Sequence, residues 1–353
     1  MKVLRLILFP FTFIYGLIVV LRNVLYDAGI LKSYKFDVPV ISIGNLTVGG
    51  TGKSPMTEYL VQLLQDRYKI AILSRGYGRK SRGFYEVQPG SSVTDAGDEP
   101  LQIKNKFPTV TVAVCENRVN GIKNLQNDYD VIILDDAYQH RAVKPGLSVL
   151  LMDYSGLLKW QWLLPTGDLR EPFSGRDRAD YIVITKTPVD QSDSERHRIT
   201  EEIQLSKKQG VFFSYIEYGE LLSVCGAAIR PLSSIKSDTM VLLLTGIAKP
   251  ALLVNQIRKY TKNIHHHCYP DHHSFTPKNI SKIAKDFNNS DKGDKIIITT
   301  EKDLQRLKSP DTKELLYELP VYYLPVKAAM HTSDKGEFDR LIMNYVTTNT
   351  RNN

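Results

Sequence analysis

The stretch that most constrains the fold of this 353-residue chain is NLTVGGTGKSP at 45–55, directly after the apolar run VPVISIG. A phosphate-binding loop has the pattern Gly-x₄-Gly-Lys-Ser/Thr, because backbone amides and one ammonium must converge on an anion. Gly52, Lys53 and Ser54 match the second half, whereas Thr47 occupies the first glycine position. The loop lies between a strand-like run and a segment with helical apolar spacing, the order that an anion site at a helix N-terminus requires. A structural turn stays open, although it needs neither lysine nor hydroxyl.

A second motif is the apolar run VIIL at 131–134, which leads directly into Asp135 and Asp136. Carboxylates at the carboxyl end of a buried strand, near a phosphate loop, are where Mg²⁺ is held in nucleotide-binding proteins. Two acidic residues after a strand are also typical of a solvated turn. Together with Lys53 and Ser54, the pair favours a nucleotide with Mg²⁺.

Apolar strand candidates alternate with helical patterns through the first two-thirds of the chain. Continuous apolar runs are typical of strands buried on both faces. We therefore expect an α/β fold, a mostly parallel sheet with helices on both faces. The expected strands are 38–43, 70–73, 110–114, 131–134, 148–152 and 182–185.

A second alternating set begins near Met240 and predicts a smaller α/β domain. Its expected elements are a strand at 241–244, a helix at 250–260, a strand at 264–269, a helix at 277–287, a strand at 295–300 and a helix at 301–307. The aromatic-rich runs VFFSYIEY (211–218) and VYYLPV (321–326) are expected to pair as a two-stranded linker and a hinge. The predicted domains are an N-terminal helix at 1–30, a nucleotide-binding domain at 31–225 and the smaller domain at 226–353.

The N-terminus, MKVLRLILFPFTFIYGLIVVLRNVL, carries no charge between Arg5 and Arg22. About sixteen uncharged residues span roughly 24 Å as a helix, short of a hydrocarbon core of roughly 30 Å. The following residues lack a small-x-small cleavage site, and an exported nucleotide loop would have no ATP. We expect a helix seated in the cytoplasmic face of a membrane, bent or loosened by Pro10 and Gly16, with Arg22, Lys32 and Lys35 near anionic headgroups. A helix buried on the protein's own core is the alternative.

The amino-acid composition argues against a disulfide-rich protein and a nucleic-acid-binding protein. Three widely spaced cysteines make a disulfide framework a poor explanation and favour a reducing compartment. The net charge of +8 suits anionic lipids, phosphorylated substrates or nucleic acid. Basic residues are dispersed and no nucleic-acid-binding motif is present, so we expect no nucleic-acid partner.

Two further stretches carry candidate catalytic residues. In TDAGDEP, Asp98 precedes Glu99 and Pro100, a pattern that fits either a helix start or a catalytic base. The segment HHHCYPDHHSFTPKN contains five histidines, but neighbouring strand residues point to opposite faces, which disfavours structural zinc. A single histidine acting beside a carboxylate is the sharper hypothesis.

An ordered series of motifs resembles the tetraacyldisaccharide 4′-kinase family of Gram-negative bacteria. The series covers nearly the whole chain: the apolar N-terminal helix, GNLTVGGTGKSP, SRGYG, GDEP, ENR, DDAYQH, LPTGDLREP, PDHHSFT and TTEKD. Each motif is weak alone, but the order is specific. Thr47 agrees with the family loop, whereas Ala137 and Tyr138 depart from residues found in many members.

The resemblance implies transfer of the ATP γ-phosphoryl group to the 4′-hydroxyl of tetraacyldisaccharide 1-phosphate at the cytoplasmic face of the inner membrane, without an obligate protein partner. It implies the cofactors ATP and Mg²⁺, with Asp98 as base and His272 assisting it once the domains close. The loop residues expected to bind nucleotide are Gly49, Gly50, Thr51, Gly52, Lys53 and Ser54, with Ser54, Asp135 and Asp136 at the metal. The residues expected to bind substrate are Asn45, Arg75, Tyr77, Glu99, Arg118, Gln139, His140, Arg170 and Glu171.

Two other functions compete with this interpretation. A nucleotide-driven metal-insertion chaperone would use the histidines, but its guanine-reading Asn/Thr-Lys-x-Asp pattern fails in TKTPVD, where Pro188 occupies the aspartate position. A membrane-anchored binding module without turnover would not need Asp98 or His272.

Overall fold

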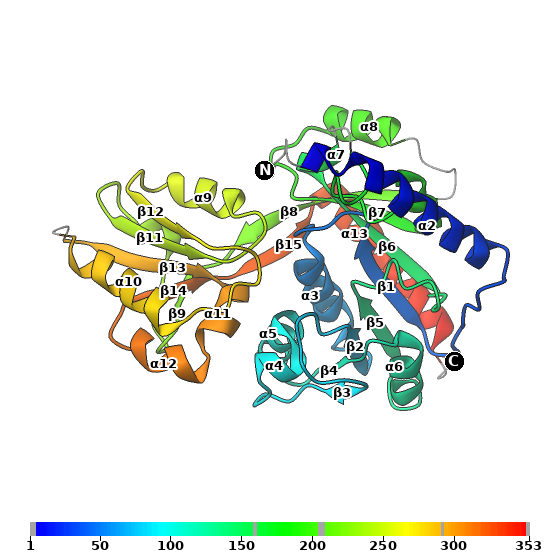
Figure 1. Ribbon diagram of the computed structural model, residues 1–353, viewed down its shortest axis with the longest axis horizontal. Coiled ribbons are helices and arrows are strands. Elements are labelled where there is room, and N and C mark those ends of the chain that lie inside the picture. Colours follow the sequence, from blue (N-terminus) through cyan, green and yellow to red (C-terminus); the bar gives the residue numbers. More distant parts are fainter. Residues whose placement is uncertain (1–4, 158–160, 204–208, 291–292, 351–353) are drawn as a thin grey trace. The chain divides into compact units, whose positions relative to one another are not determined.

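The computed structural model describes residues 5–157, 161–203, 209–290 and 293–350 (Figure 1). The chain forms two compact units. The first comprises Met1–Ile216 and Ala328–Asn353, and the second comprises Glu217–Lys327. Each unit is a sheet covered by helices, which confirms the predicted α/β class.

The first unit contains a nine-stranded sheet in the order β15-β8-β7-β6-β1-β5-β2-β4-β3. Its strands from β8 to β4 pair in parallel, and β3 pairs antiparallel with β4. The bounds are β1 Val40–Asn45, β2 Ile70–Ser74, β3 Tyr85–Glu86, β4 Thr111–Val114, β5 Val131–Asp135, β6 Leu147–Asp153, β7 Tyr181–Thr185, β8 Gly210–Tyr218 and β15 Val326–Met330. The six strands expected in this region are all present.

Helices cover both faces of this sheet, as the continuous apolar strands require. Ile41 and Ile43 of β1 pack in one core with α3 (Lys53–Leu64), α5 (Asp98–Lys106) and α13 (Thr332–Asn349). The opposite face packs against α6 (Arg118–Leu125) and α8 (Asp193–Glu202). Three short helical segments complete the unit: α4 Val93–Ala96, α7 Tyr154–Leu157 and the 3₁₀ helix η1 Phe173–Arg178.

The second unit has a six-stranded sheet in the order β10-β9-β14-β13-β11-β12. The strands are β9 Leu221–Ser223, β10 Ile229–Arg230, β11 Met240–Thr245, β12 Ile264–Cys268, β13 Lys295–Thr300 and β14 Val321–Leu324. One face packs against α10 (Pro277–Asn288), α11 (Glu301–Leu307) and α12 (Pro310–Leu316), and the other against α9 (Ala251–Arg258). A 3₁₀ helix, η2, spans Leu232–Ser234. The alternating pattern predicted from Met240 onward is present.

The expected linker and the C-terminal boundary differ from the structure. In the sheet β8 lies between β7 and β15, whereas VYYLPV mainly supplies β14, which pairs with β13 and β9, and only its last residue, Val326, belongs to β15. The chain then returns to the first unit, because α13 buries Phe338, Ile342 and Val346 in that unit's core. Residues 328–353 therefore lie outside the smaller unit, contrary to the predicted boundary of 226–353.

The N-terminal helix α2 spans Phe9–Asp27 without interruption, with a proline in its first turn rather than at a bend. Its buried residues are Thr12, Gly16 and Val19. The Thr12 hydroxyl lies 2.7 Å from that of Thr166, and the Tyr15 hydroxyl donates to a backbone carbonyl at 2.6 Å. The helix thus faces its own unit with small and polar residues, which is contrary to a core helix.

Candidate active site

The glycine-rich loop ends in a left-handed glycine that starts a helix. Gly52 has φ 87° and is the N-cap of α3, so Lys53 and Ser54 occupy the first helical turn. Residues with a side chain rarely adopt this φ, which explains the glycine. The first amides of a helix have no intrahelical acceptor, so the loop presents donors and a lysine to an anion.

The carboxylates after β5 lie beside this loop. β1 and β5 are parallel neighbours, with Ile43 opposite Asp135, so both strands end at the same edge of the sheet. Lys53 Nζ lies 3.6 Å from Asp136 Oδ2. The Thr57 hydroxyl of α3 donates to Asp135 Oδ1 at 3.4 Å. The lysine and both carboxylates therefore gather at one place.

Asp135 and Asp136 have different electrostatic environments. Burial, with the charges of Glu99 and Asp136, raises the pKa of Asp135 to about 7, outweighing Lys53 and Arg118. Burial also acts to raise the pKa of Asp136, but Lys53 and Arg170 outweigh it and the pKa is lowered. Asp136 is thus held ionised by neighbouring cations, while Asp135 lacks sufficient positive charge.

The side chains of Asp135 and Ser54 are suited to binding a divalent cation. Asp135 is 1% exposed, and its Oδ2 atom has no hydrogen-bond partner in the structure. A buried, unpartnered carboxylate oxygen is costly unless a cation balances it. A carboxylate and the hydroxyl of Ser54 are hard oxygen donors of the kind that Mg²⁺ prefers.

Thr185, the last residue of β7, and Lys186 after it bind carbonyls of the glycine-rich loop, a role that the sequence did not predict. The Thr185 hydroxyl donates to the Thr51 carbonyl at 2.7 Å. Lys186 donates to the Gly50 carbonyl and, at 3.0 Å, to the carboxylate of Asp153 on β6. Because these carbonyls already have donors on Thr185 and Lys186, the loop amides are available for an anion. The signal was the Thr-Lys pair after a buried strand, within the TKTPVD stretch.

Arg170 and Gln139 connect the loop after β5 with the LPTGDLREP segment. Arg170 Nη1 lies 3.0 Å from Asp136 Oδ1 and 3.3 Å from the Gln139 side-chain oxygen. The Gln139 amide donates to the Asn45 carbonyl at 2.8 Å. Arg170 is partly exposed beside the carboxylates, where it can meet a phosphate.

Glu171 and Asn45 are buried, and their side chains bind other segments of the protein near the site. The Glu171 carboxylate accepts hydrogen bonds from Arg178, Gln139 and Asn23. Asn45 is fully buried and donates to the Thr47 carbonyl at 2.7 Å. Both positions were expected to bind substrate, and the contacts described here join Glu171 to α2, to the loop after β5 and to η1, while Asn45 fixes the start of the glycine-rich loop.

A second basic group borders the carboxylates. Arg118 is 3% exposed, and burial lowers its pKa to about 10 against the opposing effects of Asp136 and Asp135. Burial, with Arg118 and Arg75, lowers the pKa of His140 to about 4, so this imidazole is neutral at pH 7. Its Nε2 atom has no hydrogen-bond partner. Arg118 and His140 thus belong to the same electrostatic group as Asp135.

The SRGYG and GDEP loops are packed together. A Cβ on Gly97 would meet the Tyr77 carbonyl at 3.0 Å, so only glycine permits this approach. Gly97, rather than Asp98, is the N-cap of α5. Asp98 is 4% exposed, and its Oδ1 atom accepts the Glu99 amide at 3.0 Å. Tyr77 remains 68% exposed.

The remaining predicted residue, His272, belongs to the second unit. It lies in the loop after β12 with φ 60°, a left-handed conformation uncommon for histidine. The strand β12 carries three consecutive histidines, 265–267. No group of three or more metal-ligating side chains occurs among the described residues.

A glycine-rich loop at a helix N-terminus, with lysine and buried carboxylates at the ends of parallel strands, defines a nucleotide-dependent phosphotransferase of the P-loop class. The family model for tetraacyldisaccharide-1-P 4′-kinase matches residues 4–347. The chain belongs to this family.

The sequences of related proteins align with this chain over nearly their full length. A tetraacyldisaccharide 4′-kinase from Flavobacterium psychrophilum is 45% identical, with 100% of both chains covered. One from Phocaeicola vulgatus is 44% identical, covering 98% of this chain and 96% of the relative. The crystal structure of LpxK from Aquifex aeolicus in complex with ATP has a TM-score of 0.72 at 31% identity, over 97% and 99% of the two chains.

These comparisons confirm the family, the ATP-dependent kinase activity and the fold expected from the sequence, and they give no support to a metal-insertion chaperone. The chain is a kinase of lipid A biosynthesis that acts on a lipid disaccharide.

Proposed function

We propose that this kinase transfers the γ-phosphoryl group of ATP to the 4′-hydroxyl of tetraacyldisaccharide 1-phosphate, giving a bis-phosphorylated lipid A precursor. The observation that carries the proposal is the meeting of Lys53 with Asp135 and Asp136 in a chain of this family. Relatives bearing the name of this activity match the full chain.

The phosphate loop holds the triphosphate. Loop amides from Gly49 to Gly52 and the Lys53 ammonium bind its β and γ phosphates. Ser54 and Asp135 would hold Mg²⁺, which would supply positive charge to balance the phosphate oxygens. We assign the metal contact to Asp135 rather than Asp136, because Asp136 already has Lys53 and Arg170 as partners.

The acceptor hydroxyl needs a base, because a sugar hydroxyl is scarcely ionised at neutral pH. We propose that Asp98 takes the 4′-hydroxyl proton while the hydroxyl oxygen bonds to the γ phosphorus and the bond to the leaving ADP oxygen breaks. His272 shares this proton during turnover. The proposed pocket for the phosphorylated disaccharide is formed by Arg75, Tyr77, Glu99, Arg118, Gln139, His140 and Arg170.

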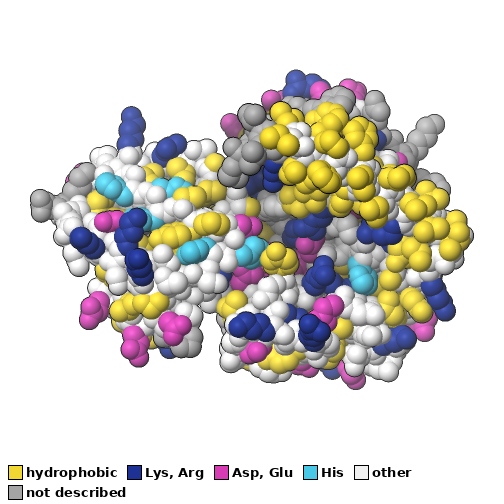
Figure 2. All heavy atoms as spheres, viewed as in Figure 1, with side chains coloured by type: hydrophobic (Ala, Val, Ile, Leu, Met, Phe, Trp, Pro, Cys, Tyr) yellow, Lys and Arg dark blue, Asp and Glu magenta, His cyan; other side chains and the backbone are white. Residues whose placement is uncertain are grey.

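The lipid substrate explains the surface of α2. This helix is long and apolar enough to cross a membrane, by length and composition, with 17% of its most apolar window buried. Figure 2 shows hydrophobic side chains gathered over it. Large exposed apolar patches mark interaction surfaces. We propose that α2 seats the enzyme in the cytoplasmic face of the inner membrane, where its acylated substrate resides.

The decisive experiment uses full-length protein in detergent with labelled ATP, Mg²⁺ and tetraacyldisaccharide 1-phosphate. We expect one phosphate added at the 4′ position, identified by fragmentation mass spectrometry. Asp98→Asn should bind ATP normally and lose at least about 100-fold in turnover, the usual contribution of a positioned base. Phosphorylation at another hydroxyl would refute the acceptor, and full turnover of Asp98→Asn would refute the base.

A further inference from the structure

His272 has an unusual backbone conformation that the neighbouring residues hold in place. At φ 60° it lies in the left-handed region, which costs free energy for a residue with a side chain. Its amide donates to the Gly246 carbonyl at 3.1 Å and to Asp271 Oδ1 at 3.1 Å. The direction of the imidazole therefore depends on where Gly246 is fixed.

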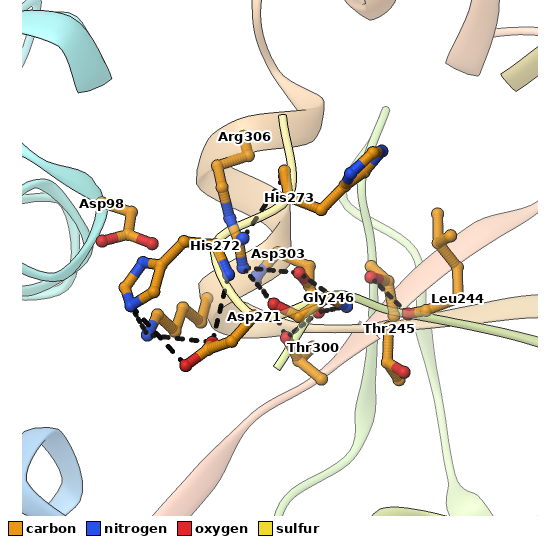
Figure 3. A network of polar contacts seen from close by, with 12 residues as sticks. Asp98, Leu244, Thr245, Gly246, Asp271, His272, His273, Thr300, Asp303 and Arg306 are labelled. Atoms are coloured by element: carbon orange, nitrogen blue, oxygen red, sulfur yellow. Dashed lines mark hydrogen bonds and ion pairs between the residues drawn. The ribbon is translucent and has the colours of Figure 1, made fainter. Parts of the chain in front are cut away.

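A buried ion pair fixes Gly246 from both sides, as Figure 3 shows. Both carboxylate oxygens of Asp303 accept the Gly246 amide at 3.1 Å, and Arg306 donates to the Gly246 carbonyl at 3.1 Å. Arg306 also donates to Asp303 at 2.6 Å and to the His273 carbonyl at 3.3 Å. The two side chains are 0% and 5% exposed, so solvent scarcely screens the pair.

The TTEKD motif builds this clamp through local hydrogen bonds. Thr300 is the N-cap of α11, and its hydroxyl accepts the Asp303 amide at 3.0 Å and donates to Asp303 Oδ2 at 2.7 Å. These bonds orient the carboxylate toward Gly246. The motif therefore starts α11 and also orients the Asp303 carboxylate that binds the Gly246 amide.

Lys302 of the same motif contacts the imidazole directly. Its ammonium lies 3.3 Å from His272 Nε2 and 3.8 Å from Asp271 Oδ1. Asp271 Oδ2 is farther from the same Nε2 atom, at 3.7 Å. Because an ammonium only donates hydrogen bonds, a neutral imidazole with this lysine contact accepts at Nε2 and carries its proton on Nδ1. The contact selects one of the two neutral tautomers.

We propose that Lys302, Asp303 and Arg306 are positioning residues for His272: the buried pair fixes its left-handed backbone, and Lys302 places its proton on Nδ1. The inference deepens the proposed function, because it rests on a role of His272 in turnover. Lys302 separates the proposal from simple stabilisation, because its ammonium contacts the imidazole directly and its loss leaves the buried Asp303–Arg306 pair in place.

The first test observes the tautomer without using activity. Full-length protein with ¹⁵N-labelled histidine is compared by long-range ¹H–¹⁵N NMR, with His272 assigned by loss of its signals in His272→Gln. We expect an Nδ1–H tautomer in the parent protein and a shift toward Nε2–H in Lys302→Met. Lys308→Met, which removes an exposed lysine just after α11, is the matched control and should leave the tautomer unchanged. An unchanged tautomer in Lys302→Met would overturn the role of Lys302.

The second test separates this inference from the proposed function. We expect Lys302→Met to lower kcat about tenfold with little change in KM for ATP, and to have no further effect in a His272→Gln background. Equal losses in both backgrounds would overturn the positioning inference while leaving the role of His272 intact. Full turnover by His272→Gln would instead refute the role of His272 in the proposed function.

The buried pair is tested by Arg306→Lys, which keeps the charge but loses the planar fork that reaches three acceptors. We expect this variant to remain folded by circular dichroism, and its loss in kcat to disappear in the His272→Gln background. A folded Arg306→Lys with parent kcat would overturn the role of the pair.

Discussion

Lys53 Nζ lies 3.6 Å from Oδ2 of Asp136, so the lysine of the glycine-rich loop and a carboxylate after β5 share one site although 83 positions separate them (136 − 53). Neither residue is close to the other in sequence, and the parallel pairing of β1 and β5 brings them together. This contact joins the two halves of a nucleotide-binding site.

Lys53→Ala should reduce kcat/KM for ATP by roughly 100- to 1000-fold, because the variant lacks the ammonium that stabilises charge on the transferring phosphoryl group. Steady-state kinetics at saturating lipid measure this loss. Lys123→Ala, at an exposed lysine of α6, is the control and should behave like the parent enzyme. Parent-like kinetics for Lys53→Ala would exclude the phosphate-loop role.

Asp135→Asn should stabilise the nucleotide-free first unit at pH 8 by at least about 1 kcal/mol, since each unit of pKa difference is worth about 1.4 kcal/mol. The folded pKa of Asp135 is about 7, raised from 3.8. The favourable contribution of its protonated form is therefore complete below about pH 4 and lost as the pH rises to 7. Urea unfolding at pH 5 and pH 8 should show the variant's advantage growing with pH, and an advantage independent of pH would contradict the prediction.

The same carboxyl group should couple Mg²⁺ binding to proton release. A metal binds the ionised carboxylate, so its arrival expels the proton that Asp135 retains below pH 7. Calorimetry of Mg²⁺–ATP binding at pH 6.5 in buffers of different ionisation enthalpy should detect this release in the parent enzyme and less of it in Asp135→Asn. Equal release in both proteins would assign the proton to another group.

Lys186→Met should weaken ATP binding about tenfold, because the Gly50 carbonyl loses the donor that holds the phosphate loop open. The variant also leaves Asp153 buried without its cation, which is destabilising. The double variant Lys186→Met/Asp153→Asn removes that charge. It should recover thermal stability without recovering ATP affinity, whereas recovery of both would assign Lys186 a purely structural role.

Local patterns in the sequence predicted the strands and the phosphate site well. Parallel strands covered on both faces must be continuous apolar runs, and VIIL before Asp135 therefore indicated both a strand and the position of its carboxylates. The order of the motifs along the chain likewise indicated the family. These features depend on neighbouring residues, which a sequence displays directly.

Contacts between residues far apart in the sequence could not be predicted from such local patterns. The return of α13 to the first unit depends on Phe338 meeting Phe212, whose ring centroids lie 5.1 Å apart across a large sequence separation. Lys186 contacts Gly50 only because β7 and β1 lie on either side of β6. Asn45 and Glu171 were expected at the substrate from the family resemblance, whereas the sequence did not show the buried contacts that they make with other segments.

The surface of α2 yields the final prediction. Phe13 and Leu17 are 65% and 71% exposed, whereas Thr12 and Gly16 face the first unit. Charges at these exposed positions disturb no buried core, although the edge contact of Phe13 with the Phe9 ring is lost, and they oppose insertion among acyl chains. Phe13→Glu/Leu17→Glu should therefore keep the parent melting temperature and lose at least about tenfold in cosedimentation with anionic vesicles. Leu315→Glu on α12, where leucine is 41% exposed, is the matched control and should bind vesicles normally. Unchanged binding by the double variant would show that α2 does not seat the enzyme in the membrane, and an equal loss in Leu315→Glu would show that added negative charge alone repels the vesicle surface.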